Sequence, residues 1–180
     1  MPDNLPYAET LAQRATELAP KHADAWFVLA MVRYSRRSAF TSAATHEGAG
    51  SAADALQRAL ALDPNNAQSI SLSAYLLIAD SLQWTEALQR AQRAVSLAPN
   101  HAGVNGRLAF IQLCFGQFDE SVRTYAHVFS LDPLAPPARY HYALALAAAG
   151  RTVDALRCIE EGRKVLGDSL LLQEIGRAHV

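Results

Sequence analysis

The amino-acid sequence predicts an all-α protein, a right-handed superhelical solenoid of antiparallel helix pairs. Three observations support this prediction. Alanine makes up about a fifth of the 180 residues and leucine is plentiful, a composition that favours helix over sheet. Similar phrases that end in proline recur along the chain, and two series of small residues keep a constant offset from each other. Such recurrence at a fixed period is typical of a repeat architecture.

Proline closes four similar phrases, of which Arg-Ala-Leu-Ala-Leu-Asp-Pro is one. These prolines are Pro20, Pro64, Pro99 and Pro133, at separations of 44, 35 and 34 residues. Proline has no backbone N–H and disfavours helix in the residue before it, so each is predicted to end a helix. The basic period is therefore 34 residues, with insertions.

Small residues recur at two positions of each unit. The first series is Ala8, Ala52, Ala87, Ser121 and Ala155, and the second series, always 22 residues further on, is Ala30, Ala74, Ala109 and Ala143. Two packed helices approach most closely where their side chains are small. The two series therefore predict the crossing points of helical hairpins.

The predicted elements follow from this register. Residues 1–22 form a partial repeat with only its second helix, from about Pro6 to Ala19. The full repeats are 23–66, 67–101, 102–135 and 136–167, each with two helices, and 168–180 form a truncated tail.

Repeat 23–66 carries a ten-residue insertion, roughly from Arg36 to Gly50, and its first helix is predicted to continue through Phe40. Ser51 and Asp54 then predict a capping box at the start of the next helix.

The last residues break the repeat. The next position of the second small series is Arg177, and a guanidinium cannot occupy a close helix crossing. Residues 174–180 resemble the translation of a sequencing-library adapter, so we expect them to be artefactual. A natural frayed tail is the alternative.

These features resemble the tetratricopeptide repeat, whose first helix carries Trp-x-x-Leu-Gly-x-x-Tyr and whose second helix carries small residues and a closing proline. The phrase that begins at Trp26 matches best, and Asn105 and Arg139 occupy its position in later repeats. The resemblance covers residues 5–167 and implies an alpha-solenoid scaffold for protein–protein interaction.

In that family the first helices line a concave groove that binds a peptide or a helical segment of a partner protein. The implied groove positions are Asp24, Phe27, Met31, Tyr34, Gln68, Ser71, Tyr75, Ile78, Gly103, Gly106, Phe110, Leu113, Pro137, Tyr140, Leu144 and Ala147. Aromatic and aliphatic residues dominate, so a carboxylate clamp is not expected. The predicted partner-binding residues are Phe27, Met31, Tyr34, Tyr75, Arg107, Phe110 and Tyr140.

Three alternatives stay open. An electrostatic partner could bind Arg33, Arg36, Arg37 and Arg107, although a solvated helix face is the simpler interpretation of the first three. The array is loosely similar to the repeat tails of bacterial nucleotide cyclases and winged-helix regulators, which implies a regulatory or sensory region of a larger protein. Self-association through exposed repeat ends is the third.

Composition and motifs argue against other classes. The net charge of −1 argues against direct binding of nucleic acid or an anionic membrane. The most apolar stretch, Tyr140 to Ala149, is too short to span a bilayer. The chain lacks phosphate-loop, dinucleotide and metalloprotease motifs, and its histidines are scattered, so neither enzymatic activity nor a cofactor or metal is expected.

Cys114 and Cys158 lie far apart and outside any CxxC spacing, so they are predicted to be small buried or half-buried residues of a protein in a reducing compartment. The first residues have neither the basic nor the apolar region of a secretory signal. A cytoplasmic location is therefore expected.

Overall fold

A computed structural model describes residues 4–39, 51–81 and 83–166, and in these ranges it contains helices and turns but no strand. The helices are α1 (Leu5–Leu18), α2 (Ala23–Ala39), α3 (Ala52–Leu62), α4 (Ala67–Ser81), α5 (Trp84–Leu97), α6 (Ala102–Cys114), α7 (Phe118–Leu131), α8 (Pro136–Ala148) and α9 (Thr152–Leu166). None of the described helices is long and apolar enough to cross a membrane.

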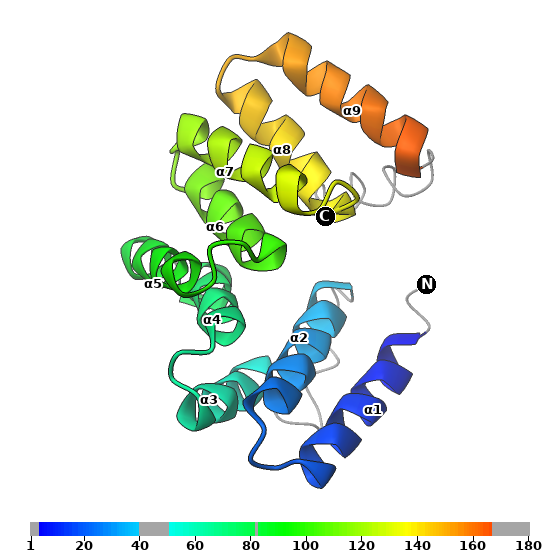
Figure 1. Ribbon diagram of the computed structural model, residues 1–180, viewed down its shortest axis with the longest axis vertical. Helices are drawn as coiled ribbons and strands as arrows, with labels where there is room; N and C mark the ends of the chain where they lie inside the picture. The colour runs from blue at the N-terminus through cyan, green and yellow to red at the C-terminus, as the bar shows by residue number, and fades with distance from the viewer. Residues whose placement is uncertain (1–3, 40–50, 82, 167–180) are drawn as a thin grey trace.

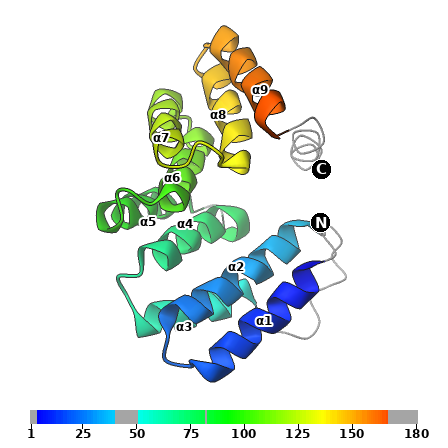
Figure 2. The ribbon, with the colours of Figure 1, turned by 45° about the vertical axis from the view of Figure 1, so that its right-hand side comes forward.

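Neighbouring helices pack as hairpins: α2 with α3, α4 with α5, α6 with α7 and α8 with α9, while α1 packs on α2. In Figure 1, α2, α4, α6 and α8 follow one another along the inner side of a curved array, with α3, α5 and α9 on the outer side. Figure 2 shows the same succession after a turn of 45°. The predicted all-α solenoid of antiparallel helix pairs is confirmed.

The helix α1 and the second helices of the first three hairpins end where the prolines predict. The helices α1, α3, α5 and α7 stop two residues before Pro20, Pro64, Pro99 and Pro133. One residue separates each helix from its proline, and this residue leaves the helical conformation. Its backbone N–H still donates to the carbonyl four residues earlier, as at Ala98, whose nitrogen lies 3.0 Å from the carbonyl oxygen of Ala94. Proline disfavours helical backbone in the residue before it, which is why this cap recurs.

Glycine ends the first helix of the last two hairpins. Gly116 and Gly150 adopt φ of 81° and 76°, in the left-handed region that glycine enters without a Cβ penalty. The N–H of Gln117 then reaches the carbonyl of Gln112 at 2.9 Å, and that of Arg151 reaches Leu146 at 2.8 Å. This closure turns the chain sharply into α7 and α9.

Small residues are buried where the hairpins pack. The second series, Ala30, Ala74, Ala109 and Ala143, is at most 4% exposed. In the first series Ser121 is fully buried, and its hydroxyl donates to the Ala109 carbonyl at 2.8 Å, which explains a polar residue at this position. Ala8 and Ala52 are only half-buried. In α1 and α3 the buried small side chains are instead Ala12, Ala55 and Ala59.

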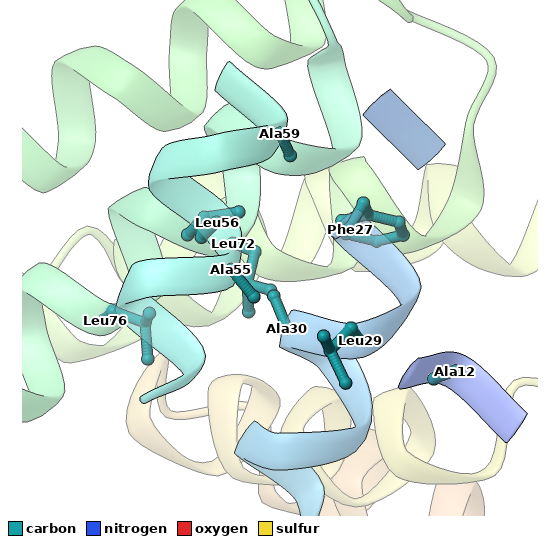
Figure 3. Close-up of a cluster of buried hydrophobic side chains, with 9 residues drawn as sticks. All are labelled: Ala12, Phe27, Leu29, Ala30, Ala55, Leu56, Ala59, Leu72 and Leu76. Carbon is teal, nitrogen blue, oxygen red and sulfur yellow. The ribbon is translucent and has the colours of Figure 1, made fainter. Parts of the chain in front are cut away.

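The core between α1 and α4 is shown in Figure 3. Phe27 and Leu29 of α2 pack with Leu56 of α3 and with Leu72 and Leu76 of α4. The same cluster includes Ala12 of α1, so α2 joins α1 to the helices that follow.

The predicted capping box is present: Ser51 accepts from the backbone N–H of Asp54 at 3.0 Å, and the Asp54 carboxylate accepts from that of Ser51 at 2.8 Å. These bonds lower the pKa of Asp54. The helix α2 is described to Ala39, so the predicted insertion up to residue 50 lies mostly outside the described residues. The tail 168–180, including the adapter-like 174–180, lies outside them entirely.

Candidate functional site

Aromatic side chains from the first helices of successive hairpins form a continuous row. Tyr34 of α2 lies 5.4 Å from Tyr75 of α4, measured between ring centroids, and Tyr75 lies 5.0 Å from Phe110 of α6. Phe110 in turn lies 4.8 Å from His141 of α8. These separations and the edge-on or tilted ring angles are those that aromatic pairs prefer. We call Tyr34, Tyr75, Phe110 and His141 the aromatic row.

The aromatic row does not follow equivalent positions of the repeat. Tyr75 and Phe110 each come one residue after the buried alanine of their helix, but Tyr34 comes four residues after Ala30. His141 comes two residues before Ala143. Packed helices cross at an angle, so the contact shifts by about one turn at each end.

The register of the repeat does not identify His141, because the contact shifts along α8. In the sequence His141 is only one of several scattered histidines. Tyr140, which was predicted at this place, contacts the aromatic row only through the His141 ring, at 5.5 Å. The structure thus brings together Tyr34, Tyr75 and Phe110 of the predicted site, with Tyr140 beside them.

Other predicted groove positions are less accessible. Phe27 is 8% exposed and belongs to the core cluster of Figure 3. Ser71 and Ile78 are also buried, whereas Leu144 is 42% exposed. The side chain of Pro137 lies outside the described part of the chain.

Arg107 is half-buried beside the aromatic row. Its guanidinium donates to Ser71 Oγ at 3.0 Å and to the Gly103 carbonyl at 3.3 Å, and lies 3.0 Å from Met31 Sδ. Burial lowers the pKa of Arg107, and the nearby Tyr34 and Tyr75 partly oppose this effect. Within the described residues this cation forms no ion pair.

The other predicted cations are engaged elsewhere. Arg33 Nε lies 3.1 Å from Glu9 Oε1, and Arg36 pairs with the other carboxylate oxygen of Glu9. Glu9 is only 4% exposed. The simple interpretation of Arg33 and Arg36 as a solvated helix face is therefore wrong: they join α2 to a buried carboxylate of α1. The side chain of Arg37 is not among those described.

Neither of two pockets on the molecule contains a predicted site residue. One of about 480 Å³ lies between α7, α8 and α9 and includes Phe129 and Tyr142. Another of about 560 Å³ lies between α3, α4 and α5 and includes Leu56 and Leu76. In the described parts of the chain, no three His, Cys, Asp or Glu side chains are grouped to hold a metal ion.

The two cysteines differ in their surroundings. Cys158 is buried, as predicted, and its thiol faces the Arg139 carbonyl at 3.7 Å. Cys114 is exposed. The prediction that it is buried or half-buried is wrong because it is the last residue of α6, beyond the turn that packs on α7.

No protein-family model matches the chain, and the search of curated proteins finds no significant match. Solved structures do share its fold. TTC0263, a thermophilic TPR protein of Thermus thermophilus, superposes with a TM-score of 0.74 at 16% identity, over 99% of this chain and 92% of that one.

Two further structures are also similar. YrrB, described as a TPR protein with an unusual peptide-binding site, gives a TM-score of 0.59 at 23% identity, over 95% of this chain and 83% of that one. MamA gives 0.56 at 15% identity, over 90% and 82%. At such low identity these likenesses establish the fold, the helical-hairpin solenoid of TPR proteins.

Proposed function

We propose that this chain, whose fold is that of tetratricopeptide-repeat proteins, is a non-catalytic scaffold that binds a peptide or helical segment of a partner protein. The segment lies along the inner face formed by α2, α4, α6 and α8. The division into the repeats 23–66, 67–101, 102–135 and 136–167 belongs to this proposal, since each hairpin supplies one stretch of the face.

The aromatic row is the observation that carries the proposal. Its rings come from four different hairpins, and their contacts produce one aromatic strip that crosses the hairpin boundaries. Tyrosine and phenylalanine provide large contact areas while few rotatable bonds lose freedom, which is why they concentrate binding energy at interfaces. Met31, half-buried next to the same face, adapts its shape readily.

The site also favours a mainly apolar contact over a purely electrostatic one. Two of the arginines that an electrostatic partner would need, Arg33 and Arg36, are paired with Glu9. A protein partner is therefore proposed in preference to a nucleic acid or a membrane surface. The description of YrrB as peptide-binding supports the same class of ligand for this fold.

Two further parts of the proposal rest on single features. Self-association is proposed through the end helices, where Leu18 of α1 and Val153 of α9 are 71% and 72% exposed. A cytoplasmic location is proposed because both cysteines are free.

A selection from a random twelve-residue peptide library, followed by calorimetry with the selected peptides, tests the main proposal. Tyr75→Ala and Phe110→Ala should each weaken binding by about 1 to 3 kcal/mol. Phe118→Ala is the matched control, because Phe118 is 38% exposed at the start of α7, away from the aromatic row. Failure to enrich any peptide, or equal effects of all three variants, would refute the proposal.

A further inference from the structure

We infer that the bound segment carries an aspartate or glutamate side chain in its interior, and that Arg107 binds this carboxylate beside the aromatic row. The inference deepens the proposed function and rests on it, because it specifies the chemistry of the segment that the inner face holds. It also assigns Arg107 a role distinct from that of the aromatic rings.

No described acidic side chain forms an ion pair with Arg107. Its protein contacts are a hydroxyl, a backbone carbonyl and a thioether, all of them neutral. Removing a charge from water is costly unless an opposite charge pairs with it, and a bound anion would reduce this cost. The lowered pKa of Arg107 has the same cause, removal of the guanidinium from water.

Donors remain available on this guanidinium. Arginine has five N–H groups. Three hydrogen bonds of Arg107 are present, two from Nη1 and one from Nη2, so Nε–H and one Nη2–H have no partner among the described residues. A carboxylate is the group whose two oxygens match the planar arginine donors best.

Among the residues that the structure describes, the four helices of the inner face place no acidic residue close to Arg107 along the helices. The helices α6 and α8 contain no acidic residue at all. On α2, Asp24 lies at the far N-terminal end, where its carboxylate accepts from Asn66 at 2.9 Å. On α4 the one acidic residue is Asp80, near the C-terminal end, whereas Ser71, which Arg107 contacts, is near the start. The described part of the inner face therefore leaves this position open to a carboxylate of the partner.

The position of Arg107 favours an interior side chain over a chain end. The guanidinium reaches from α6 back to Ser71 of α4 and Met31 of α2, so it lies beside the part of the aromatic row that Tyr34 and Tyr75 form. A segment that contacts Tyr34 at one end and His141 at the other must pass Arg107 on its way. A terminal carboxylate at Arg107 would leave part of the aromatic row without a ligand.

The test uses the peptides from the library selection, synthesised with acetylated and amidated ends so that only side chains carry charge. We expect an acidic residue in them, and its exchange for Asn or Gln should weaken binding to the wild-type chain about tenfold. With Arg107→Met the acidic and amide peptides should bind within about twofold of each other, and as weakly as the amide peptide binds the wild type.

Two further variants separate charge from folding. Arg107→Lys keeps the charge but loses the planar donor pair, so it should retain only part of the preference for the acidic peptide. Arg123→Met, at an exposed arginine of α7, is the matched control and should retain all of it. In the free protein, Arg107→Met should leave the melting temperature unchanged or raise it, because an unpaired charge is removed and Ser71 keeps its bond to the Gln68 carbonyl.

The outcomes distinguish this inference from the proposed function. If the peptides depend on Tyr75 but the acidic and amide versions bind equally, the inference is refuted and the proposed function stands. If an amide-side-chain peptide with a free C-terminal carboxylate binds in an Arg107-dependent way, the anion is a chain end and the inference is likewise refuted. If no peptide is selected, both fail.

Discussion

The side-chain nitrogen of Asn105 lies 2.8 Å from the carbonyl oxygen of Pro99, the proline that closes the preceding helix. Two other residues, chemically different from Asn105, also donate a hydrogen bond to the carbonyl of the proline six residues before them. The indole of Trp26 donates to Pro20 at 2.9 Å, and the guanidinium of Arg139 donates to Pro133 at 3.0 Å. What these positions share is an N–H donor that ties the start of one hairpin to the end of the previous one.

Removing this donor should loosen the junction between hairpins. Trp26→Phe keeps an aromatic ring but loses the N–H, and it should lower the free energy of unfolding by about 1 kcal/mol. Asn105→Ala, which loses bonds to both Pro99 and His101, should cost about 1 to 3 kcal/mol. Urea unfolding measures both, with Gln89→Ala, on the exposed side of α5, as the control. Costs no larger than that of Gln89→Ala would show that the bond does not stabilise the junction.

Most of the fold could be predicted from the sequence because its determinants are local. A proline acts on the residue before it, and a small side chain marks a close approach wherever it occurs, as at Ala74 and Ala109. The common role of Trp26, Asn105 and Arg139 could not be predicted, since their side chains look unrelated and only the carbonyl that they face reveals the shared donor.

The buried carboxylate of Glu9 should matter more than an exposed one of the same helix. Glu9→Gln should lower the free energy of unfolding by about 1.5 to 3 kcal/mol, because charged bonds to Arg33 and Arg36 become weaker. Glu17→Gln is the control: its pair with Arg14 is largely exposed, and such pairs contribute about 0 to 1 kcal/mol. Equal midpoints of urea unfolding for the two variants would contradict this account.

The buried hydroxyl of Tyr125 should make the protein sensitive to alkaline pH. Tyr125 is 1% exposed, its hydroxyl has no hydrogen-bond partner among the described residues, and burial raises its pKa. As the pH rises above about 10, the ordinary value for tyrosine, the unfolded chain loses this proton first. The unfolded state then binds fewer protons than the folded state, so stability is full below pH 10 and falls above it.

The variant Tyr125→Phe should show both consequences. At neutral pH it should raise the free energy of unfolding by about 1 kcal/mol, since an unpaired buried hydroxyl is removed. Above pH 10 its stability should fall less steeply than that of the wild type, although Tyr75 and Tyr142, whose pKa values are also raised by burial, keep part of the slope. Thermal melting from pH 7 to 11 measures this, with exposed Tyr7→Phe as control. A destabilised Tyr125→Phe would contradict the account.

The candidate site was predictable only in part, because it depends on contacts between helices. The register of the repeat identified Tyr34, Tyr75 and Phe110 but could not give the diagonal path that brings in His141. It also could not show that Arg33 and Arg36 share Glu9 while Arg107 has no ion pair with any described residue, since the Glu9 carboxylate lies 24 residues from Arg33 in the sequence.

Nuclear magnetic resonance mapping of a selected peptide on the isotope-labelled full chain tests the central claim most directly. During the titration, the largest chemical-shift changes should fall in α2, α4, α6 and α8, around Tyr34, Tyr75, Phe110 and His141, because the peptide lies along the aromatic row. Changes confined to the second helices of the hairpins, α3, α5, α7 and α9, with the signals of these four residues unmoved, would contradict it.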